Sequence, residues 1–286
     1  MHKSISVSFL GIVLLCMACS NRTEQGNRIT VTIEPQRYFA EQLVDSLFEI
    51  TTMVPLGNSP ESYDPSPRQM TQLAESKAYF CIGHIGFENA WLDRLKQNNP
   101  HLLFFDNSQG IHYSLHDEEE THSHSHAAID PHTWMSPKEV RIIVQNMFKA
   151  LVEIDPEHTP VYQANLEKLI REIDETDQMV QSYLSRSSQK AFIIYHPALT
   201  YFARDYGLTQ YAIELDGKEP SPEQLKKLTD TAKAENIKTV FIQQEFDRKN
   251  AEIIARETGC RLVVINPLSY QWKEEVVRIA KILSGE

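Results

Sequence analysis

The chain has 286 residues, of which 41% are hydrophobic and 23% charged, with only 10 glycines and 14 prolines. This length predicts about two globular domains, and the composition excludes disordered, fibrous and polytopic membrane proteins. The 28 basic and 39 acidic residues give a formal charge of −11, and no cluster of Lys or Arg stands out. We therefore expect no nucleic-acid partner.

The first 18 residues have the pattern of a secretory signal peptide. Met1-His2-Lys3 is a short basic start, residues 5–18 are apolar and uncharged, and polar residues follow. The apolar run is shorter than the roughly 20 residues that a membrane-spanning helix needs, so we expect export rather than insertion into a membrane. Residues 19–27 would then form a tether before the first domain.

The end of this segment, residues 14–19 (LLCMAC), resembles a bacterial lipoprotein signal. In such a signal a small residue precedes a cysteine that becomes the lipidated N-terminus, and Ala18 and Cys19 match these two positions. Cys16 stands where the signal usually has leucine, and a plain cleaved signal peptide is the alternative. The resemblance implies a membrane anchor at Cys19, on the periplasmic or the cell-surface side.

After this segment, short apolar runs alternate with stretches that have helical spacing. Strands parallel to one another and separated by helices are the pattern of α/β domains. The fold class is therefore predicted as α/β, with parallel-sheet lobes at residues 28–155 and 188–286. The expected strands are residues 29–33, 78–82, 102–105, 191–195, 239–242 and 262–265. The cysteines in or beside these runs, Cys81 and Cys260, are expected to be buried thiols.

Two helices are predicted with particular clarity. Apolar residues keep helical spacing from Val140 to Ile154, after a typical helix start at Ser136-Pro137. Residues 156–187 contain no strand pattern and no Gly or Pro after Pro160, which predicts one helix of about 25 residues. We expect this long helix to join the two lobes rigidly.

Residues 112–126 form the one compositionally biased segment, with five of the 11 histidines beside four acidic residues. This composition cannot build a core, so we expect a solvated loop. The loop is either an accessory metal-binding segment or an acidic tether with incidental histidines. Its histidines are His112, His116, His122, His124 and His126.

Two further histidines occupy positions suited to metal binding. His132 follows Pro131, and Asp130 lies close enough to orient its imidazole. His196 ends an expected strand, and ligands of parallel sheets bind beyond the carboxyl ends of their strands. For each histidine the alternative is a purely structural role.

Two polar segments remain open between two interpretations. The proline-rich loop at residues 54–67 contains Glu61 and Asp64, and Asp64 could simply organise a turn. Residues 243–246 (QQEF) follow an expected strand, and they either line a cleft or form a polar turn.

Three motifs together resemble a known family. They are the loop at residues 60–67, Asp130-Pro131-His132 with Trp134, and His196-Pro197-Ala198 with the aromatic residues that follow. In this order they are similar to the metal-site motifs of the zinc/manganese solute-binding proteins of bacterial ABC transporters. The resemblance implies two lobes joined by a rigid helix, a metal ion in the cleft between them, and delivery to a membrane permease. We expect a monomer.

The resemblance also implies a ligand set. His132 and His196 match two imidazole ligands of the family, whereas Glu61 stands where the family usually has histidine and Asp64 where it has glutamate. Asn266, in Val264-Ile265-Asn266-Pro267-Leu268, stands where the family often has aspartate. The implied site is Glu61, His132 and His196, with Asn266 or water as a weak fourth ligand.

Two imidazoles and one carboxylate with an open position suit Zn²⁺, and the same set resembles the facial triad of Fe(II) oxygenases. The carboxylate of Glu61 moves the preference toward Mn²⁺ or Fe²⁺, whereas the loss of an aspartate at Asn266 moves it back. The histidine-rich loop favours zinc, so we expect Zn²⁺ with Mn²⁺ or Fe²⁺ as alternatives.

The resulting hypothesis is an exported lipoprotein, not an enzyme, that captures Zn²⁺ and delivers it to an ABC permease. One alternative is a divergent relative whose weakened site leaves an adhesin or a partner-binding lipoprotein. Another is an extracytoplasmic metalloenzyme, for which the sequence offers no obvious general acid or base.

Overall fold

The computed structural model describes residues 26–114, 129–214 and 218–286. The signal peptide, Cys19 and most of the expected tether lie outside these residues. So do four histidines of the biased loop, His116, His122, His124 and His126. His112 is described and is exposed to solvent.

The N-terminal lobe contains a four-stranded parallel sheet in the order β2-β1-β3-β4. The central strand β3 is buried along its whole length, which is why it reads in the sequence as an unbroken apolar run. The elements of this lobe are β1 (Arg28–Val31), α1 (Glu34–Val44), β2 (Glu49–Thr52), α2 (Pro67–Ala74), β3 (Ala78–Cys81), α3 (Gly86–Asn98) and β4 (Leu103–Asp106).

The C-terminal lobe repeats this architecture with the strand order β6-β5-β7-β8, again all parallel. The central strands β5 and β7 are buried throughout. The elements are β5 (Ala191–Ile194), α6 (Thr200–Tyr206), β6 (Thr209–Ala212), α7 (Pro222–Ala234), β7 (Thr239–Gln243), α8 (Lys249–Thr258) and β8 (Arg261–Ile265).

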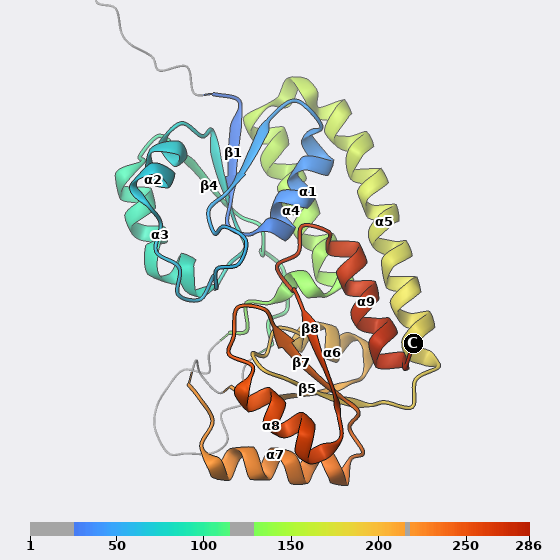
Figure 1. The fold of residues 1–286 in the computed structure, drawn as a ribbon. Helices are drawn as coiled ribbons and strands as arrows, with labels where there is room; N and C mark the ends of the chain where they lie inside the picture. Colours follow the sequence, from blue (N-terminus) through green and yellow to red (C-terminus); the bar gives the residue numbers. More distant parts are fainter. Residues whose placement is uncertain (1–25, 115–128, 215–217) are drawn as a thin grey trace, which may run out of the picture.

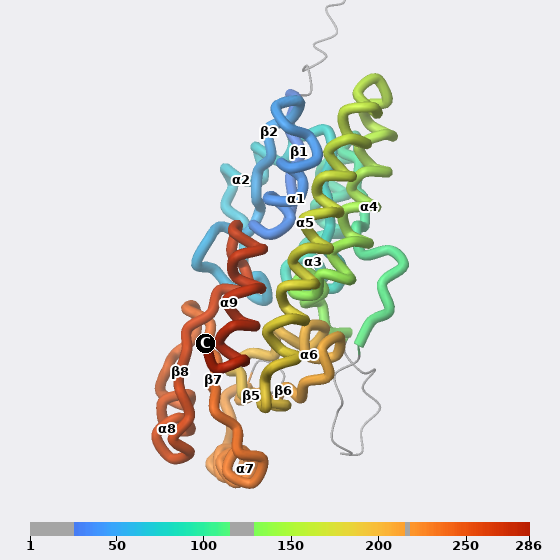
Figure 2. Tube along the Cα trace, turned by 90° about the vertical axis from the view of Figure 1, so that its right-hand side faces the viewer, coloured from blue at the N-terminus to red at the C-terminus, as the bar shows by residue number. Residues whose placement is uncertain are grey.

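Helices α4 (Pro137–Ile154), α5 (Thr159–Ser185) and α9 (Trp272–Ser284) connect the lobes. The side chain of Ser136 caps α4 by accepting the Glu139 N–H, and the short turns η1 (Thr133–Met135) and η2 (Pro156–His158) precede α4 and α5. Helix α5 has 27 residues and runs along both lobes, with α9 beside it (Figures 1 and 2). This confirms the predicted long helix and the two-lobed α/β fold.

One hydrophobic core runs through both lobes. The same buried cluster contains Phe39 of α1, Phe192 of β5 and Trp272 of α9, and the rings of Phe39 and Trp272 lie 5.2 Å apart. Because α4, α5 and α9 share this core with both sheets, the connection is a packed layer rather than a flexible linker.

Two strands that the sequence analysis did not predict lie at sheet edges, β2 (EITT) and β6 (TQYA). Cys81 and Cys260 are free and buried, as predicted. Within the described parts of the chain, no helix combines the length and the apolarity needed to cross a membrane.

Candidate metal centre

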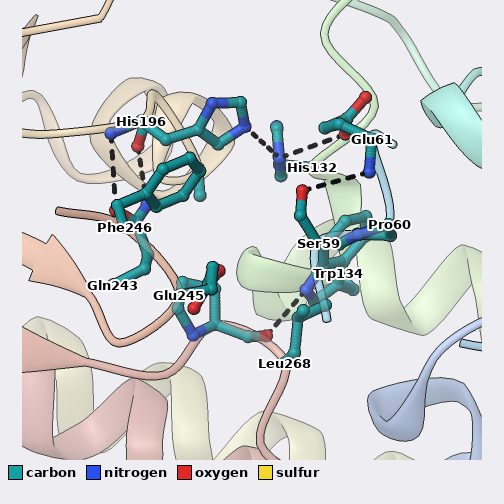
Figure 3. Close-up of a pocket in the computed structure, with 12 residues that line it drawn as sticks. Ser59, Pro60, Glu61, His132, Trp134, His196, Gln243, Glu245, Phe246 and Leu268 are labelled. Atoms are coloured by element: carbon teal, nitrogen blue, oxygen red, sulfur yellow. Dashed lines mark hydrogen bonds and ion pairs between the residues drawn. The ribbon is translucent and has the colours of Figure 1, made fainter. Parts of the chain in front are cut away.

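The candidate site lies where loops from the two lobes meet. The cavity is lined by residues 59–61, His132 with Trp134, His196 with Ala198, Gln243 at the end of β7, Glu245 and Phe246 of the turn that follows, and residues 267–268 (Figure 3). The Glu61 loop follows β2 and the His196 loop follows β5, so each comes from the carboxyl end of a parallel strand. The cavity has a volume of about 20 Å³, which is room for one ion or water molecule.

Glu61, His132 and His196 point toward one another in this cavity. One ligand atom from each lies within 4.8 Å of the other two. The Nε2 atoms of His132 and His196 are 3.2 Å apart, and Glu61 Oε1 is 3.9 Å from His132 Nε2 (Figure 3). A tetrahedral ion with bonds of about 2.0–2.1 Å separates its ligand atoms by about 3.3 Å. The three side chains are therefore close to the geometry of a transition-metal site.

Each imidazole has a carboxylate on its far side. Asp130 Oδ1 lies 2.9 Å from His132 Nδ1 and also accepts the His132 backbone N–H, while Glu214 Oε1 lies 3.4 Å from His196 Nδ1. These contacts assign the proton of each neutral ring to Nδ1 and leave an Nε2 lone pair facing the cavity. Carboxylates that orient metal-binding imidazoles in this way also raise their basicity.

The Asp130–His132 pair shifts both pKa values. Burial lowers the pKa of His132, but the charge and the hydrogen bond of Asp130 outweigh this effect, and the pKa is raised overall. Burial raises the pKa of Asp130, but His132 outweighs it, and the pKa is lowered. An electron-rich, firmly held imidazole at His132 follows from this pairing.

Glu61 is positioned by the N-terminus of α3. The Gly86 N–H donates to Glu61 Oε2 at 3.0 Å, and the Phe87 N–H donates to the carbonyl of Pro60 at 2.7 Å. A Cβ atom on Gly86 would lie 2.6 Å from Glu61 Oε2 and 2.7 Å from its Cα, so this close approach requires glycine. The dipole of α3 favours the charged carboxylate.

The second oxygen of Glu61 has no such partner. Oε1 is buried and accepts no hydrogen bond within the described part of the chain. A buried carboxylate oxygen without a donor is unfavourable, and it faces the imidazole of His132. This oxygen fits a bound cation.

Other residues suggested by the sequence lie elsewhere. Asn266 is not among the residues that line the cavity: its Oδ1 accepts the Leu268 N–H at 3.1 Å, and its own N–H donates to Glu275. Asp64 is exposed and accepts the indole N–H of Trp91 at 3.1 Å.

The sequence left open whether residues 243–246 line a cleft or form a polar turn. Of the two interpretations, the structure supports the cleft lining, because Gln243, Glu245 and Phe246 all border the cavity. Sequence reasoning missed Glu214, which follows the unpredicted strand β6. Recognising β6 would have placed Glu214 beside His196 at the same sheet edge.

Comparison with known proteins places this chain in a family. Residues 29–277 match the family described as zinc-uptake complex component A, periplasmic (ZnuA). This chain belongs to that family. The high-affinity zinc uptake system protein ZnuA of Bacillus subtilis is 27% identical over 281 residues, which cover 92% of this chain and 87% of that protein.

Two further relatives extend the comparison. A crystal structure of ZnuA superposes with a TM-score of 0.84 and 37% identity, covering 91% of this chain and 98% of that chain. The zinc-binding lipoprotein AdcA of Streptococcus pneumoniae is 25% identical over 290 residues, which cover 96% of this chain and 57% of AdcA. The ZnuA structure and this chain thus share their fold over nearly the whole described length.

Proposed function

We propose that this chain binds one divalent transition-metal ion, Zn²⁺ in preference to Mn²⁺ or Fe²⁺, and delivers it to the permease of an ABC transporter. The observation that carries the proposal is the convergence of Glu61, His132 and His196 on one small cavity, with a buried Glu61 oxygen to which no described residue donates. Two imidazoles and a carboxylate suit Zn²⁺. Membership in the ZnuA family supports the same cargo.

Binding without turnover explains this cavity better than catalysis. The cavity, about 20 Å³ in volume, accommodates a single ion. The family match and the ligand geometry also favour metal capture over a weakened site in an adhesin. We therefore assign the protein a transport role.

We further propose an extracytoplasmic protein anchored through Cys19. The signal-like residues 1–18 and the relative named as a zinc-binding lipoprotein support this location. Residues 28–155 and 188–286 would form the lobes of a monomer, with residues 156–187 as the connector. The loop histidines, including exposed His112, would bind additional metal ions weakly.

The test is a competitive titration of the chelator-stripped mature protein with Zn²⁺, Mn²⁺ and Fe²⁺. We expect one tight Zn²⁺ equivalent in the wild type and its loss, by at least 100-fold in affinity, in the double variant H132A/H196A. Removing both imidazoles takes away both nitrogen ligands, and the carboxylate oxygen that remains cannot hold zinc tightly on its own.

The matched control is H101A/H158A, which removes two histidines outside the cavity. This variant should bind like the wild type. Absence of tight binding for all three metals in the wild type, or tight binding that survives in H132A/H196A, would contradict the proposed function.

A further inference from the structure

Three ligand atoms leave one position of a tetrahedral ion unfilled. We propose that Glu245, rather than Asn266, supplies the fourth protein ligand and thereby widens the metal range of the site toward Mn²⁺. This inference rests on the proposed function, because it concerns the same ion bound by Glu61, His132 and His196. Two observations support it: the turn after β7 is held against His196, and the other polar side chains around the cavity already have hydrogen-bond partners.

The turn that carries Glu245 is fastened to His196. Gln243 brackets the backbone of His196, because its Nε2 donates to the His196 carbonyl at 2.7 Å and its Oε1 accepts the His196 N–H at 3.4 Å. Phe246 stacks on the imidazole with ring centroids 5.4 Å apart and planes inclined by 20°. Glu245 stands between Gln243 and Phe246 in the sequence, so its backbone keeps a fixed position relative to one metal ligand. Its side chain borders the same cavity (Figure 3).

The other polar side chains of the cavity already have partners. Ser59 Oγ accepts the Glu61 N–H, and the indole N–H of Trp134 donates to the Pro267 carbonyl. Both ends of the Gln243 amide bind the backbone of His196. None of these groups is a charged oxygen donor that could complete a metal site.

The carboxylate of Glu245 is the remaining candidate. It is half-buried, and among the described residues its one hydrogen bond comes from its own backbone N–H. Burial raises its pKa, while the nearby His196 acts in the opposite direction. A partly desolvated carboxylate with so few donors gains from approaching a cation.

Glu245 stands outside the group of three whose ligand atoms lie within 4.8 Å. Ligation therefore requires rotation of its side chain, which has three rotatable bonds. Asn266, by contrast, uses its side-chain oxygen to accept the Leu268 N–H. Metal binding would have to break that hydrogen bond before Asn266 could serve.

A second carboxylate changes the donor set to two nitrogens and two oxygens. Zn²⁺ tolerates three protein ligands and a water molecule, whereas Mn²⁺ prefers oxygen donors. Glu245 should therefore matter more for Mn²⁺ than for Zn²⁺. The ratio of the two affinities is the quantity that reports its role.

The experiment compares E245Q with wild type by competitive titration with Zn²⁺ and Mn²⁺, and by the visible absorption spectrum of bound Co²⁺. We expect Mn²⁺ affinity to fall at least tenfold, Zn²⁺ affinity to fall less, the stoichiometry of one to persist, and the Co²⁺ spectrum to change. E245D, which keeps the charge but shortens the side chain, should lie between the two. Circular dichroism and thermal melting establish that the variants fold.

The matched controls are E252Q, an exposed glutamate on α8, and N266A. Both should retain wild-type affinities and the wild-type Co²⁺ spectrum. Wild-type metal binding by E245Q, or a loss of affinity in N266A that E245Q does not share, would overturn this inference. The proposed function would stand in either case, provided that the wild type binds one metal ion that H132A/H196A does not.

Discussion

Two acids of the N-terminal lobe, Glu61 and Glu88, are held by the short connection between β3 and α3. Glu88 is only 3% exposed, and its carboxylate accepts the backbone N–H groups of Ile82 and Gly83, each at 2.8 Å. The same connection ends at Gly86, whose N–H binds Glu61. Glu88 therefore helps to fix the connection whose Gly86 N–H holds Glu61, a candidate metal ligand.

Burial raises the pKa of Glu88 from 4.5 to about 7, against the hydrogen bonds from Thr32, Ile82 and Gly83 that lower it. The folded protein thus holds this proton more tightly than the unfolded chain does. Its contribution to stability is greatest below pH 4.5 and is lost as the pH rises to about 7, a difference of about 3 kcal/mol.

We predict that E88Q flattens the dependence of the free energy of unfolding on pH between pH 5 and about 7. The free energy of unfolding of the metal-free protein should be measured in urea between pH 5 and 8, for wild type and E88Q. The E88Q variant is expected to be less stable than wild type at each pH, because the amide nitrogen of glutamine faces backbone N–H donors. Its free energy of unfolding should nevertheless lack the decline with rising pH that Glu88 causes. Parallel curves for the two proteins would show that Glu88 titrates normally.

At the scale of elements, two tryptophans join the start of α9 to the segment that carries His132. The indole N–H of Trp134 donates to the Pro267 carbonyl at 2.9 Å, and that of Trp272 donates to the Trp134 carbonyl at 2.7 Å. Both side chains are buried. The His132 segment is thereby fastened to the loop between β8 and α9, although it belongs to the chain before α4.

We predict that W272F lowers the free energy of unfolding by about 2–4 kcal/mol, because it leaves the buried Trp134 carbonyl without its donor and removes ring volume from the core. Urea denaturation of the metal-free protein measures this loss. The control is W91F, whose indole donates to exposed Asp64 and whose loss should cost about 0.5 kcal/mol or less. Equal losses in the two variants would rule out a special role for the Trp134–Trp272 pair.

At the scale of the whole molecule, α4, α5 and α9 make the two lobes one packed body with the candidate metal site between them. The described residues on either side of the histidine-rich loop are joined to each other, because the Asp130 N–H donates to the Ser114 carbonyl at 3.1 Å. The hydroxyl of Tyr201 also bridges them, accepting the Ser114 N–H and donating to the Asp130 carbonyl. The loop can therefore be shortened without opening the site.

We predict that deletion of residues 116–126 leaves the tight Zn²⁺ equivalent within about threefold of its wild-type affinity and removes weaker equivalents, because the clamped ends stay in place and closing a shorter loop costs little. Equilibrium dialysis with Zn²⁺ counts both classes. Replacing only the four histidines of this segment by serine separates loop length from metal ligands. Loss of the tight equivalent in the deletion variant would mean that the loop supplies a primary ligand.

Features that depend on neighbours in the sequence were predictable. The long helix α5 follows from an apolar period uninterrupted by Gly or Pro, and the buried strands β3, β5 and β7 follow from apolar runs, because burial on both faces demands them. His132 and His196 were predictable from their short motifs. Asp130 was predictable because it lies two residues from the ring that it orients.

The remaining features depend on contacts between distant parts of the chain. Strands β2 and β6 have mixed polar sequences and gain their hydrogen bonds only by pairing with β1 and β5. The position of Glu214 behind His196 depends on β6. The choice between Glu245 and Asn266 depends on the hydrogen-bond partners that the surrounding loops give to each side chain. The 3.2 Å between the two imidazoles was set by neither motif. This distance arises because the packed helices hold together two lobes, each of which has its own sheet.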